Sequence, residues 1–308
     1  MDRLITLVGG TGFVGAALVE HLAHAGWRVR VVSRHPNRAQ RLRTLGDVGQ
    51  ISLVQGDVRA PGSILAAMYG ADAAVNLVGI LDEKGGQHFA DVQRGGAGAV
   101  AAAAARAGVA ALVHVSAIGA DAKSDSAYAR TKAEGEAAVR AAFAQAAIVR
   151  PSLIFGAEDR FTNRFAAMMG LVPAIPVIAA DTRFQPVFVQ DVAAAIAAAL
   201  HRPGETFELG GPEVLTMHAI MALIAQAAGQ DKPLVDVPAL GGRALAAFGF
   251  LPGAPLTADQ YRLLQKDNIA AAALPGLESL GVAPTPMAAV AGDWLARYRT
   301  GGRFAAQA

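Results

Sequence analysis

The stretch LVGGTGFVGAALVEHLAHAGWRVRVVSRHPNR, residues 7–38, places a glycine-rich turn between an apolar run and a helical pattern. The apolar run Leu4–Val8 predicts a buried strand, and the spacing from Phe13 to Ala25 predicts a helix that ends at Gly26. Glycines at this spacing, in the order strand, turn and helix, are typical of dinucleotide-binding sites; they are Gly9, Gly12 and Gly15.

Each glycine of the turn has a separate physical role. Gly9 permits the tight turn, Gly12 lets the backbone approach a pyrophosphate, and Gly15 lets the helix pack close to the sheet. The start of the helix offers free N–H groups and a partial positive charge to phosphates. We therefore predict that a pyrophosphate binds to the turn and the first helical turn, at Gly9, Thr11, Gly12, Phe13, Val14 and Gly15.

The end of the second predicted strand carries an arginine. An acid at this point would bond the ribose 2′-hydroxyl of NAD and repel a 2′-phosphate. The sequence instead reads Ser33-Arg34-His35, and Arg34 can make a bidentate, charge-assisted contact with a phosphate. Arg38 lies a helical turn further on and could add to this contact. The pattern predicts NADP(H) as the cofactor, in the form of NADPH, in preference to NAD(H).

Composition limits the class of protein. The chain has 308 residues, of which 53% are hydrophobic and 17% are charged, and this favours a packed globular α/β protein. The net charge of +2 is too small to indicate a nucleic-acid partner. A basic cluster could serve a phosphate, an acidic partner or simply a solvated helix face; it contains Arg28, Arg30, Arg34, Arg38, Arg41 and Arg43.

Metal, secretion and membrane signals are not evident in the sequence. There is no cysteine, and the pair His21 and His24 has no acid cluster beside it, so we expect no metal site. We expect neither a signal peptide nor a transmembrane segment, because no apolar run reaches the ~18 residues that a span needs.

Short apolar runs alternate with helical patterns through the first half of the chain. The predicted strands are Leu4–Val8, Val29–Val32, Ile51–Gln55, Ala73–Leu77, Ala111–Val115 and Ala147–Arg150. Helices are predicted at Phe13–Ala25, Ala97–Ala107 and Ala127–Gln145. This alternation predicts an α/β fold, a Rossmann-type doubly wound parallel sheet.

The pattern becomes less regular after residue 150. We expect an NADP(H)-binding domain at 1–150 and a smaller mixed C-terminal region at 151–308, interwoven with the first, that resembles a substrate or docking region. Three helices are predicted there: Asp191–His201 with Asp191 as N-cap, Met217–Ala228 capped by Thr216, and a last one opened by Thr285-Pro286.

A second group of residues has the chemistry of hydride transfer at a carbonyl. Ser116 follows the fifth predicted strand, and Tyr128 and Lys132 lie four residues apart on the next helix, so they share one face. The lysine would lower the tyrosine pKa and bind ribose hydroxyls, the tyrosine would exchange a proton with a substrate oxygen, and the serine would polarise it. A chance pairing is the alternative. We predict Ser116, Tyr128 and Lys132 as the catalytic residues. The same three residues could also be the remnant of a site that no longer catalyses a reaction.

Further cofactor contacts are expected where other strands end. Asp57, followed by Val58, could bond the adenine amino group or instead cap a helix. The segment Asn76-Leu77-Val78-Gly79 ends the fourth strand, where backbone passes close to the cofactor, or forms a simple strand-to-loop turn. The segment Arg150-Pro151-Ser152 ends the sixth strand and is expected near the nicotinamide.

These motifs resemble the short-chain dehydrogenase/reductase superfamily, of the extended or atypical kind. The supporting motifs occur in the order of that superfamily: GGTGFVG, GDV, NLVG, HVSAIGA, YARTK and RPSLIFG. The resemblance implies an NAD-dependent epimerase/dehydratase-like fold.

A narrower resemblance covers nearly the whole chain. Segments of both halves are similar to the bacterial relatives of the NAD(P)H-binding accessory subunit of respiratory complex I, the 39-kDa subunit in mitochondria; they include VNLVGIL, AYARTKAEGE, RPSLIFGAEDRFTNRFA, RFQPVFVQDVA and PLTADQYRLLQKDN. This resemblance implies a nucleotide that is structural or regulatory and is not turned over. It implies other complex I subunits near the quinone site as partners, and a peripheral location on the cytoplasmic side of the bacterial inner membrane.

The residues alone leave other functions open. The chain keeps Ser116, Tyr128 and Lys132, so a free-standing NADP-dependent reductase, epimerase or dehydratase that uses Tyr128 is the main alternative. A redox-sensing regulator that binds NADP(H) and a partner protein is a third possibility. We side with the accessory subunit because its resemblance spans both halves of the chain.

Overall fold

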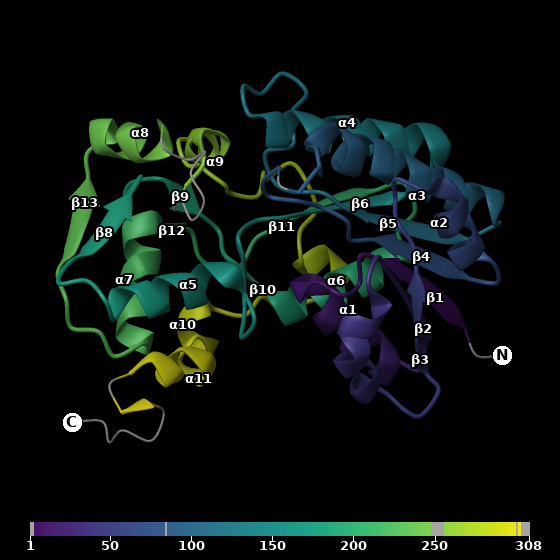
Figure 1. Ribbon diagram of the computed structural model, residues 1–308, viewed down its shortest axis with the longest axis horizontal. Helices are drawn as coiled ribbons and strands as arrows, with labels where there is room; N and C mark the ends of the chain where they lie inside the picture. The colour runs from purple at the N-terminus through teal and green to yellow at the C-terminus, as the bar shows by residue number, and fades with distance from the viewer. Residues whose placement is uncertain (1–2, 84, 248–255, 300, 303–308) are drawn as a thin grey trace. The chain divides into compact units, whose positions relative to one another are not determined.

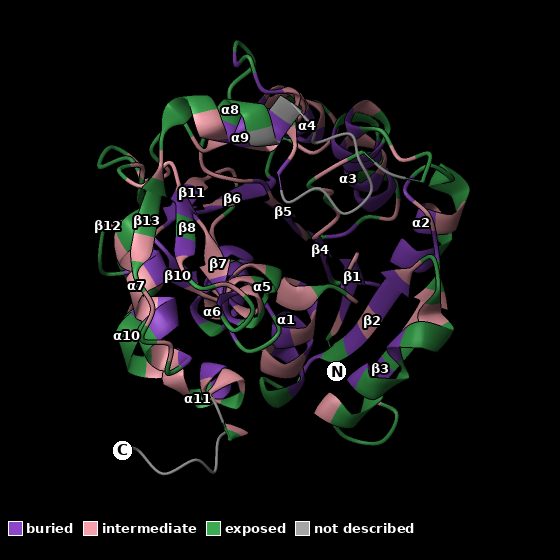
Figure 2. Ribbon diagram, turned by 60° about the vertical axis from the view of Figure 1, so that its left-hand side comes forward, coloured by how far each residue is buried: buried purple, intermediate pink, exposed green. Residues whose placement is uncertain are grey.

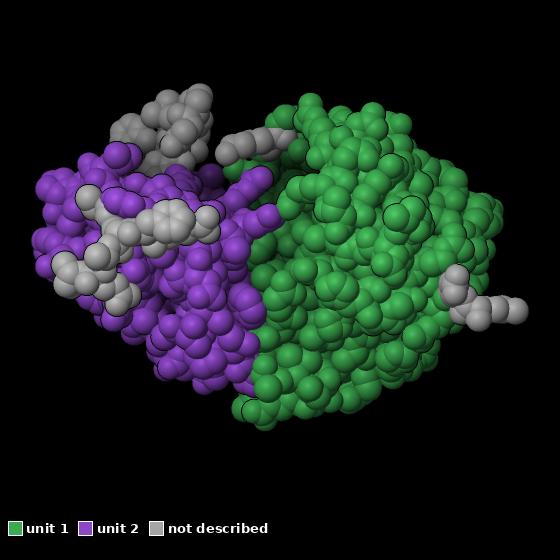
Figure 3. Space-filling model, turned by 90° about the horizontal axis from the view of Figure 1, so that it is seen from below, with its two compact units in different colours: residues 1–151, 189–209, 271–283 green, residues 152–188, 210–270, 284–308 purple. Residues whose placement is uncertain are grey.

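The computed structural model divides the chain into two compact units (Figure 3). It describes residues 3–83, 85–247, 256–299 and 301–302. Unit 1 comprises residues 1–151, 189–209 and 271–283. Unit 2 comprises residues 152–188, 210–270 and 284–308. Each unit is therefore assembled from segments that are distant in the sequence.

Within the described residues, unit 1 is built on a parallel sheet of seven strands (Figure 1). Their order is β11-β6-β5-β4-β1-β2-β3. The strands are β1 (Leu4–Val8), β2 (Arg28–Ser33), β3 (Ile51–Gln55), β4 (Ala73–Asn76), β5 (Ala111–Val115), β6 (Ala147–Pro151) and β11 (Thr206–Leu209). Most residues of β1, β4 and β6 are buried, as Figure 2 shows, and this explains why their sequences are largely apolar.

Helices cover both faces of this sheet. On one face, α2 (Pro61–Met68), α3 (Gly96–Arg106) and α4 (Ala127–Ala142) share a hydrophobic cluster with the strands. On the other face, α1 (Phe13–His24) packs against α6 (Val189–Ala199) (Figure 1). The predicted class, a Rossmann-type doubly wound parallel sheet, is confirmed.

The edge strand β11 was not predicted from the sequence. It pairs in parallel with β6, with Thr206 beside Ile148 and Leu209 beside Pro151. The chain therefore returns to the sheet after residue 188, through α6 and β11. The short segment TFEL lies among glycines and prolines, which hid it from the sequence pattern.

Several helix limits differ from those predicted. A π-helical turn, η2 (Ala90–Gly95), precedes α3, and α4 ends at Ala142 instead of Gln145. Asp191 was predicted as an N-cap but lies within the first turn of α6, because the helix already begins at Val189. Two 3₁₀ segments, η1 (Pro36–Leu45) and η3 (Glu278–Leu280), complete unit 1.

Unit 2 is a mixed assembly of short elements. Its strands form three pairs: β7 (Ile154–Phe155) with β10 (Val187–Phe188), β9 (Arg183–Phe184) with β12 (Leu215–Thr216), and β8 (Ile175–Ile178) with β13 (Leu234–Val237). Its helices are α5 (Arg160–Met169), α7 (Met217–Ala227), α8 (Ala239–Ala247), α9 (Ala258–Leu263), α10 (Met287–Val290), α11 (Gly292–Leu295) and η4 (Ala296–Tyr298).

Aromatic packing and helix caps organise unit 2. The rings of Phe188 and Trp294 are stacked with centroids 6.5 Å apart, and both contact Phe155 in the core of this unit. Thr216 caps α7 as predicted, since its hydroxyl accepts the Ala219 N–H at 3.1 Å. Thr285 does not cap the last helical region, because the N-cap of α10 is Pro286.

Among the residues that the structure describes, no helix has the length and apolar character to span a membrane.

Candidate functional site

The glycine turn joins β1 to α1 and is held by the backbone. The Gly9 N–H donates to the Val32 carbonyl at 3.0 Å, and the φ of Gly9 is +82°. A Cβ at Gly9 would lie 2.9 Å from Val78 Cγ2 and 3.2 Å from the Leu77 carbonyl carbon. Gly9 is therefore required both by its backbone conformation and by the close approach of the chain after β4.

The other two glycines have different surroundings. A Cβ at Gly15 would lie 2.5 Å from the carbonyl carbon of Gly10, so this glycine lets the helix pack on its own entry turn. We had expected it to serve contact with the sheet. A Cβ at Gly12 would meet only the Gly9 oxygen, at 3.7 Å, so the chain itself leaves room there. Gly12 is the N-cap of α1, and no side chain among the described residues caps it. Thr11, Phe13 and Val14 complete this turn, which suits a pyrophosphate.

The predicted 2′-phosphate residues follow β2. Ser33 is the last residue of that strand, and Arg34 is exposed. Arg34 Nη1 donates to Gln87 Oε1 at 2.9 Å. Arg38 is exposed in η1, where its backbone N–H bonds the His35 carbonyl at 3.1 Å. Of the wider arginine cluster, Arg30 is structural, because it donates to the carbonyls of Ala67 and Tyr69 at the end of α2.

Asp57 lies after β3 and is engaged by an arginine that we did not single out. Its carboxylate accepts from Arg59 Nη2 at 2.8 Å and from the Arg59 N–H at 2.9 Å. The bond to Arg59, with a smaller contribution from the charge of Arg34, lowers the pKa of Asp57. Asp57 caps no helix, since Ala60 is the N-cap of α2, and Val58 is buried in the core.

The segment after β4 lies against Lys132. Leu77 and Val78 continue the strand, and a Cβ at Gly79 would lie 3.3 Å from Lys132 Nζ. Lys132 is 6% exposed, and its ammonium donates to the Val115 carbonyl at 3.2 Å. Burial lowers the pKa of Lys132 to about 8, while the nearby Glu136 carboxylate opposes this shift. The structure thus brings Gly79 and Lys132 together at the carboxyl ends of β4 and β5.

Tyr128 occupies the first turn of α4, and its ring packs edge-on against Phe89 with centroids 6.0 Å apart. Burial raises the pKa of Tyr128 to about 12. The sequence had suggested that Lys132 lowers this pKa, and that expectation is wrong for this structure. The phenolate is disfavoured by its low-polarity surroundings, while the lysine ammonium donates to a backbone carbonyl.

Ser116 is buried, and its hydroxyl has no hydrogen-bond partner among the described residues. The same holds for Nε2 of His114, two residues earlier on the strand. Buried polar atoms are rarely left unpartnered in proteins. This observation agrees with a site that receives a polar ligand near Ser116.

A buried ion network holds α4 to the strands beneath it. Arg150 makes a bidentate contact with Glu136 at 2.8 and 2.6 Å and reaches Glu208 at 3.3 Å. Glu208 also accepts the Ala271 N–H at 2.8 Å. The network fixes the helix that carries Tyr128 and Lys132, so Arg150 acts in the packing of unit 1.

The last predicted contacts fall in different units. Pro151 ends β6 in unit 1, and its carbonyl accepts the Ile118 N–H at 3.1 Å. Ser152 belongs to unit 2, where its hydroxyl lies 2.7 Å from Asn268 Oδ1 and 3.0 Å from the Asn268 carbonyl oxygen.

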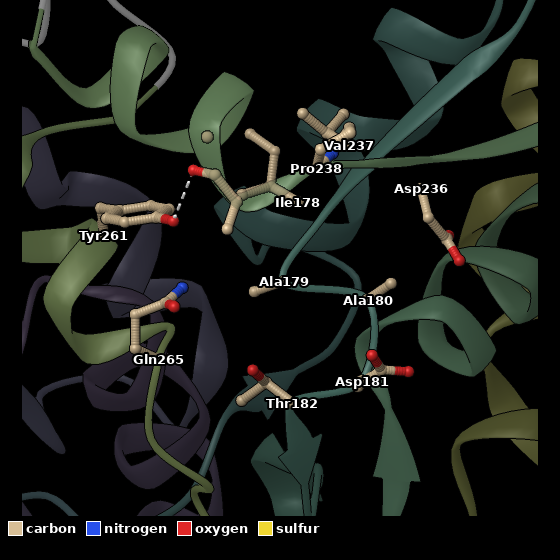
Figure 4. Close-up of a pocket in the computed structure, with 12 residues that line it drawn as sticks. Ile178, Ala179, Ala180, Asp181, Thr182, Asp236, Val237, Pro238, Tyr261 and Gln265 are labelled. Atoms are coloured by element: carbon tan, nitrogen blue, oxygen red, sulfur yellow. Dashed lines mark hydrogen bonds between the residues drawn. The ribbon is translucent and has the colours of Figure 1, made fainter.

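Unit 2 has a pocket of its own, with a volume of about 390 Å³ (Figure 4). The Tyr261 ring forms one wall, and its hydroxyl donates to the Ala239 carbonyl at 3.1 Å. Asp181 and Asp236 add carboxylates to the lining, and Asp236 is paired with His218 at 2.8 Å. The predicted nucleotide-binding residues are not among the residues that line this pocket.

No group of His, Asp and Glu side chains in the described part of the chain is arranged to hold a metal ion.

The strand order and the glycine turn define a Rossmann-type protein of the dinucleotide-binding class. A family model described as the NAD dependent epimerase/dehydratase family matches residues 5–210, and the chain belongs to this family.

Relatives and solved structures agree with this assignment. The chain is 36% identical over 307 residues to NADH dehydrogenase (ubiquinone) 1 alpha subcomplex subunit 9, mitochondrial, of Mus musculus, covering 96% of this chain and 80% of the mouse protein. This match confirms the resemblance seen in the sequence. The chain is also 35% identical over 200 residues to ceramide reductase of Caulobacter vibrioides, covering 65% of this chain and 62% of that protein.

Among solved structures, triphenylmethane reductase of Citrobacter sp. superposes with a TM-score of 0.77 at 19% identity, covering 94% of this chain and 99% of that one. At this identity, the likeness concerns the fold.

Sequence reasoning missed two residues around the site. Gln87 contacts Arg34, and His114 lies two residues before Ser116. Only His114 left a signal, as a polar residue within the buried strand ALVHV. Gln87 lies 53 residues from Arg34 in the sequence, so no local pattern could identify it. Arg150 was expected near the nicotinamide, and in the structure its side chain binds Glu136 and Glu208.

Proposed function

We propose that this chain is an NADP(H)-binding accessory subunit of respiratory complex I, the NADH:quinone oxidoreductase. The observation that carries the proposal is the 36% identity to the mouse subunit over 96% of the chain, which includes unit 2. Members of epimerase-like families differ most in that second region, so similarity there supports a shared role.

The nucleotide in this proposal is NADPH, held as a structural or regulatory group. The turn from Gly9 to Gly15 would bind the pyrophosphate, with Arg34 and Arg38 beside Ser33 at the 2′-phosphate. Asp57 and Val58 would adjoin the adenine, and the segment Leu77–Gly79 would line the ribose side together with Tyr128 and Lys132. The open space at Gly12 and the unpartnered hydroxyl of Ser116 support this assignment.

Docking would use the region from residue 151 onward, with residues 1–150 as the nucleotide-binding part. The partners would be other complex I subunits near the quinone site, and the location the cytoplasmic side of the bacterial inner membrane. The chain would be held there peripherally, through protein contacts.

The test is copurification from native membranes. An affinity-tagged chain is recovered in mild detergent, and the eluate is separated on a native gel stained for NADH dehydrogenase activity. We expect the chain to migrate with that activity, and we expect membranes of a strain without complex I to lose it. A chain that stays on those membranes undiminished, or that migrates alone, would overturn the proposal.

A second candidate is a free-standing NADP-dependent reductase. It is favoured by the retained Ser116, Tyr128 and Lys132 and by the similarity to ceramide reductase. Tyr128, protonated at neutral pH, would donate a proton to the carbonyl oxygen of the substrate while the carbonyl carbon receives hydride from the nicotinamide. NADPH consumption by the purified chain with long-chain ketones, which Tyr128→Phe abolishes, would favour this candidate.

A further inference from the structure

Two buried polar atoms stand on the strand that leads to the candidate site. His114 Nε2 and Ser116 Oγ have no hydrogen-bond partner among the described residues, and the two side chains are only 1% and 4% exposed. Polar atoms at this depth almost always have a hydrogen-bond partner, and where the protein offers none the partner is a water or a ligand. The two residues therefore point to one more molecule in this part of unit 1.

The hydrogen bonds of Asn76 fix the tautomer of His114. The Val78 N–H donates to Asn76 Oδ1 at 3.1 Å, so the Asn76 amide turns its Nδ2 toward His114. Nδ2 can only donate, and it lies 3.1 Å from His114 Nδ1, which must accept. A neutral imidazole that accepts at Nδ1 carries its proton on Nε2. His114 Nε2–H is therefore a buried donor without an acceptor in the chain.

The imidazole is neutral for two physical reasons. Burial and, to a smaller extent, the positive charge of Lys132 lower the pKa of His114 to about 3. His114 thus supplies a donor beside the lysine without adding a second positive charge. This arrangement suits a site that already contains one buried ammonium.

Both side chains lie on one face of the sheet. Alternate residues of a strand point to the same side, and Leu112, His114 and Ser116 alternate along β5. Leu112 belongs to the hydrophobic cluster that the strands share with α3 and α4, so His114 and Ser116 face the helix that carries Lys132. The Ser116 N–H bonds the Val149 carbonyl at 2.7 Å, which extends the strand pairing to Ser116.

The spacing along the strand suits one bridging molecule. Residues two apart on a strand have Cα atoms about 6.6 Å apart. One hydrogen bond spans about 2.8 Å, whereas two that meet at a water oxygen span up to about 5.6 Å. Side chains that extend from such a pair toward the same side of the strand can bring their polar atoms within this span, so one water is the simplest common partner for the two unpartnered atoms.

We propose that His114 and Ser116 bind one buried water, and that His114 positions the Ser116 hydroxyl through it. His114 Nε2–H donates to the water oxygen, and a water hydrogen is donated to Ser116 Oγ. Ser116 keeps its own hydrogen for an oxygen of the bound nucleotide, so this step rests on the proposed function. Hydrogen bonds in a chain strengthen one another, which makes Ser116 a better donor.

The first experiment examines the full-length protein without relying on nucleotide affinity. Nitrogen-15 spectra of histidine-labelled protein are expected to show His114 as the Nε2–H tautomer at neutral pH. A crystal structure at atomic resolution is expected to show a water oxygen within hydrogen-bond distance of His114 Nε2 and Ser116 Oγ. The Nδ1–H tautomer, or no water between the two atoms, would overturn the proposal.

The second experiment is a double-mutant cycle on NADPH affinity, measured by calorimetry. His114→Leu should weaken binding about three- to tenfold, the range of one hydrogen bond, and His114→Gln, which keeps a donor, should restore most of the affinity. Ser116→Ala should weaken binding to a similar degree. The double variant should bind no more weakly than Ser116→Ala alone, because both changes interrupt one chain of hydrogen bonds.

The outcomes separate this proposal from the proposed function. Losses that add in the double variant would overturn the positioning role of His114. If the unaltered protein binds no NADPH, the proposed function fails, and the spectra and the crystal structure still decide whether the water site exists. If His114→Leu does not fold, His114→Gln and Ser116→Ala remain to be compared.

Discussion

At the scale of single residues, Gly12 and Gly15 lie three positions apart and answer to different constraints. A Cβ at Gly15 would overlap the Gly10 backbone at 2.5 Å, whereas a Cβ at Gly12 has 3.7 Å to its nearest neighbour. The fold of the turn therefore requires a glycine at position 15. A side chain at Gly12 would contact little of the chain itself, so Gly12 matters only if a ligand approaches it.

This difference predicts that one added methyl group lowers the stability of the protein at Gly15 but lowers its NADPH affinity at Gly12. Gly15→Ala should destabilise the protein by about 1–3 kcal/mol through overpacking. Gly12→Ala should leave the unfolding temperature nearly unchanged but reduce NADPH affinity at least about tenfold, by occupying the space near the pyrophosphate. Thermal unfolding and calorimetry on both variants check this, with Gly62→Ala, which meets nothing within 4 Å, as the control. Full NADPH affinity in Gly12→Ala would contradict the assigned pyrophosphate site.

Arg34 is the residue on which cofactor preference depends. It is exposed, and its hydrogen-bond partner Gln87 is neutral, so a 2′-phosphate can replace this contact with a charge-assisted one. Arg34→Asp should weaken NADPH binding about ten- to a hundredfold, the loss of a charge-assisted contact of roughly 1.5–3 kcal/mol. Arg43→Asp makes the same charge change at an exposed position within η1 and should have little effect. Equal affinity of the unaltered protein for NADPH and NADH would rule the preference out.

At the scale of elements, α4 carries a buried lysine and a partly buried tyrosine whose pKa values are shifted in opposite directions. The pKa of Lys132 is lowered to about 8 and the pKa of Tyr128 is raised to about 12, in both cases because burial disfavours the charged form. The Glu136–Arg150–Glu208 network fixes the same helix one turn after Lys132. The surroundings of the helix therefore favour the neutral amine of Lys132 and the neutral phenol of Tyr128 over their charged forms.

These shifts predict the stability of the nucleotide-free protein at alkaline pH. Between about pH 8 and 10 the unfolded lysine still binds a proton that the folded lysine has released, so the free energy of unfolding should rise with pH. Above about pH 10 the folded tyrosine keeps a proton that the unfolded one loses, so the free energy should fall. Each slope is at most about 1.4 kcal/mol per pH unit.

Urea unfolding across this range checks the prediction. Lys132→Met should remove the rise and Tyr128→Phe should remove the fall. A rise that persists in Lys132→Met would mean that another group titrates there.

At the scale of the whole molecule, the chain completes its nucleotide-binding unit only after passing through unit 2. Residues 189–209 and 271–283 return to unit 1, and β11 adds the edge strand of its sheet. Any part of unit 2 that docks to a partner is thus joined to unit 1 by several chain crossings. The proposed function predicts that loss of the nucleotide affects assembly.

Two variants separate assembly from chemistry. Tyr128→Phe should lower NADH:quinone turnover of the complex by no more than about twofold, since an accessory subunit takes part in no proton transfer of the rate-limiting step. Gly12→Val should empty the nucleotide site, remove the stabilisation that binding provides and reduce retention of the subunit. Turnover and subunit content are measured on the purified complex. A large loss of turnover in Tyr128→Phe, with NADPH bound and the complex assembled, would favour the reductase.

The sequence by itself determined the features that depend on short-range order. Six strands, the glycine turn, the helix from Phe13 and the cap at Thr216 follow from apolar runs, helical spacing and single capping residues, and the structure has each of them. Ser116, Tyr128 and Lys132 could be placed because the motif order fixes where strands and helices end.

Only the tertiary structure decided what depends on residues distant in the sequence. The pairing of β11 with β6, the Arg30 bonds to the end of α2 and the Arg150–Glu208 contact join segments 37 to 58 residues apart. The Nε2–H tautomer inferred for His114 depends on its contact with Asn76, 38 residues away. The raised pKa of Tyr128 comes from burial by surrounding elements. Short-range periodicity encodes which elements form, whereas polarity and protonation at a site depend on the neighbours that packing brings to it.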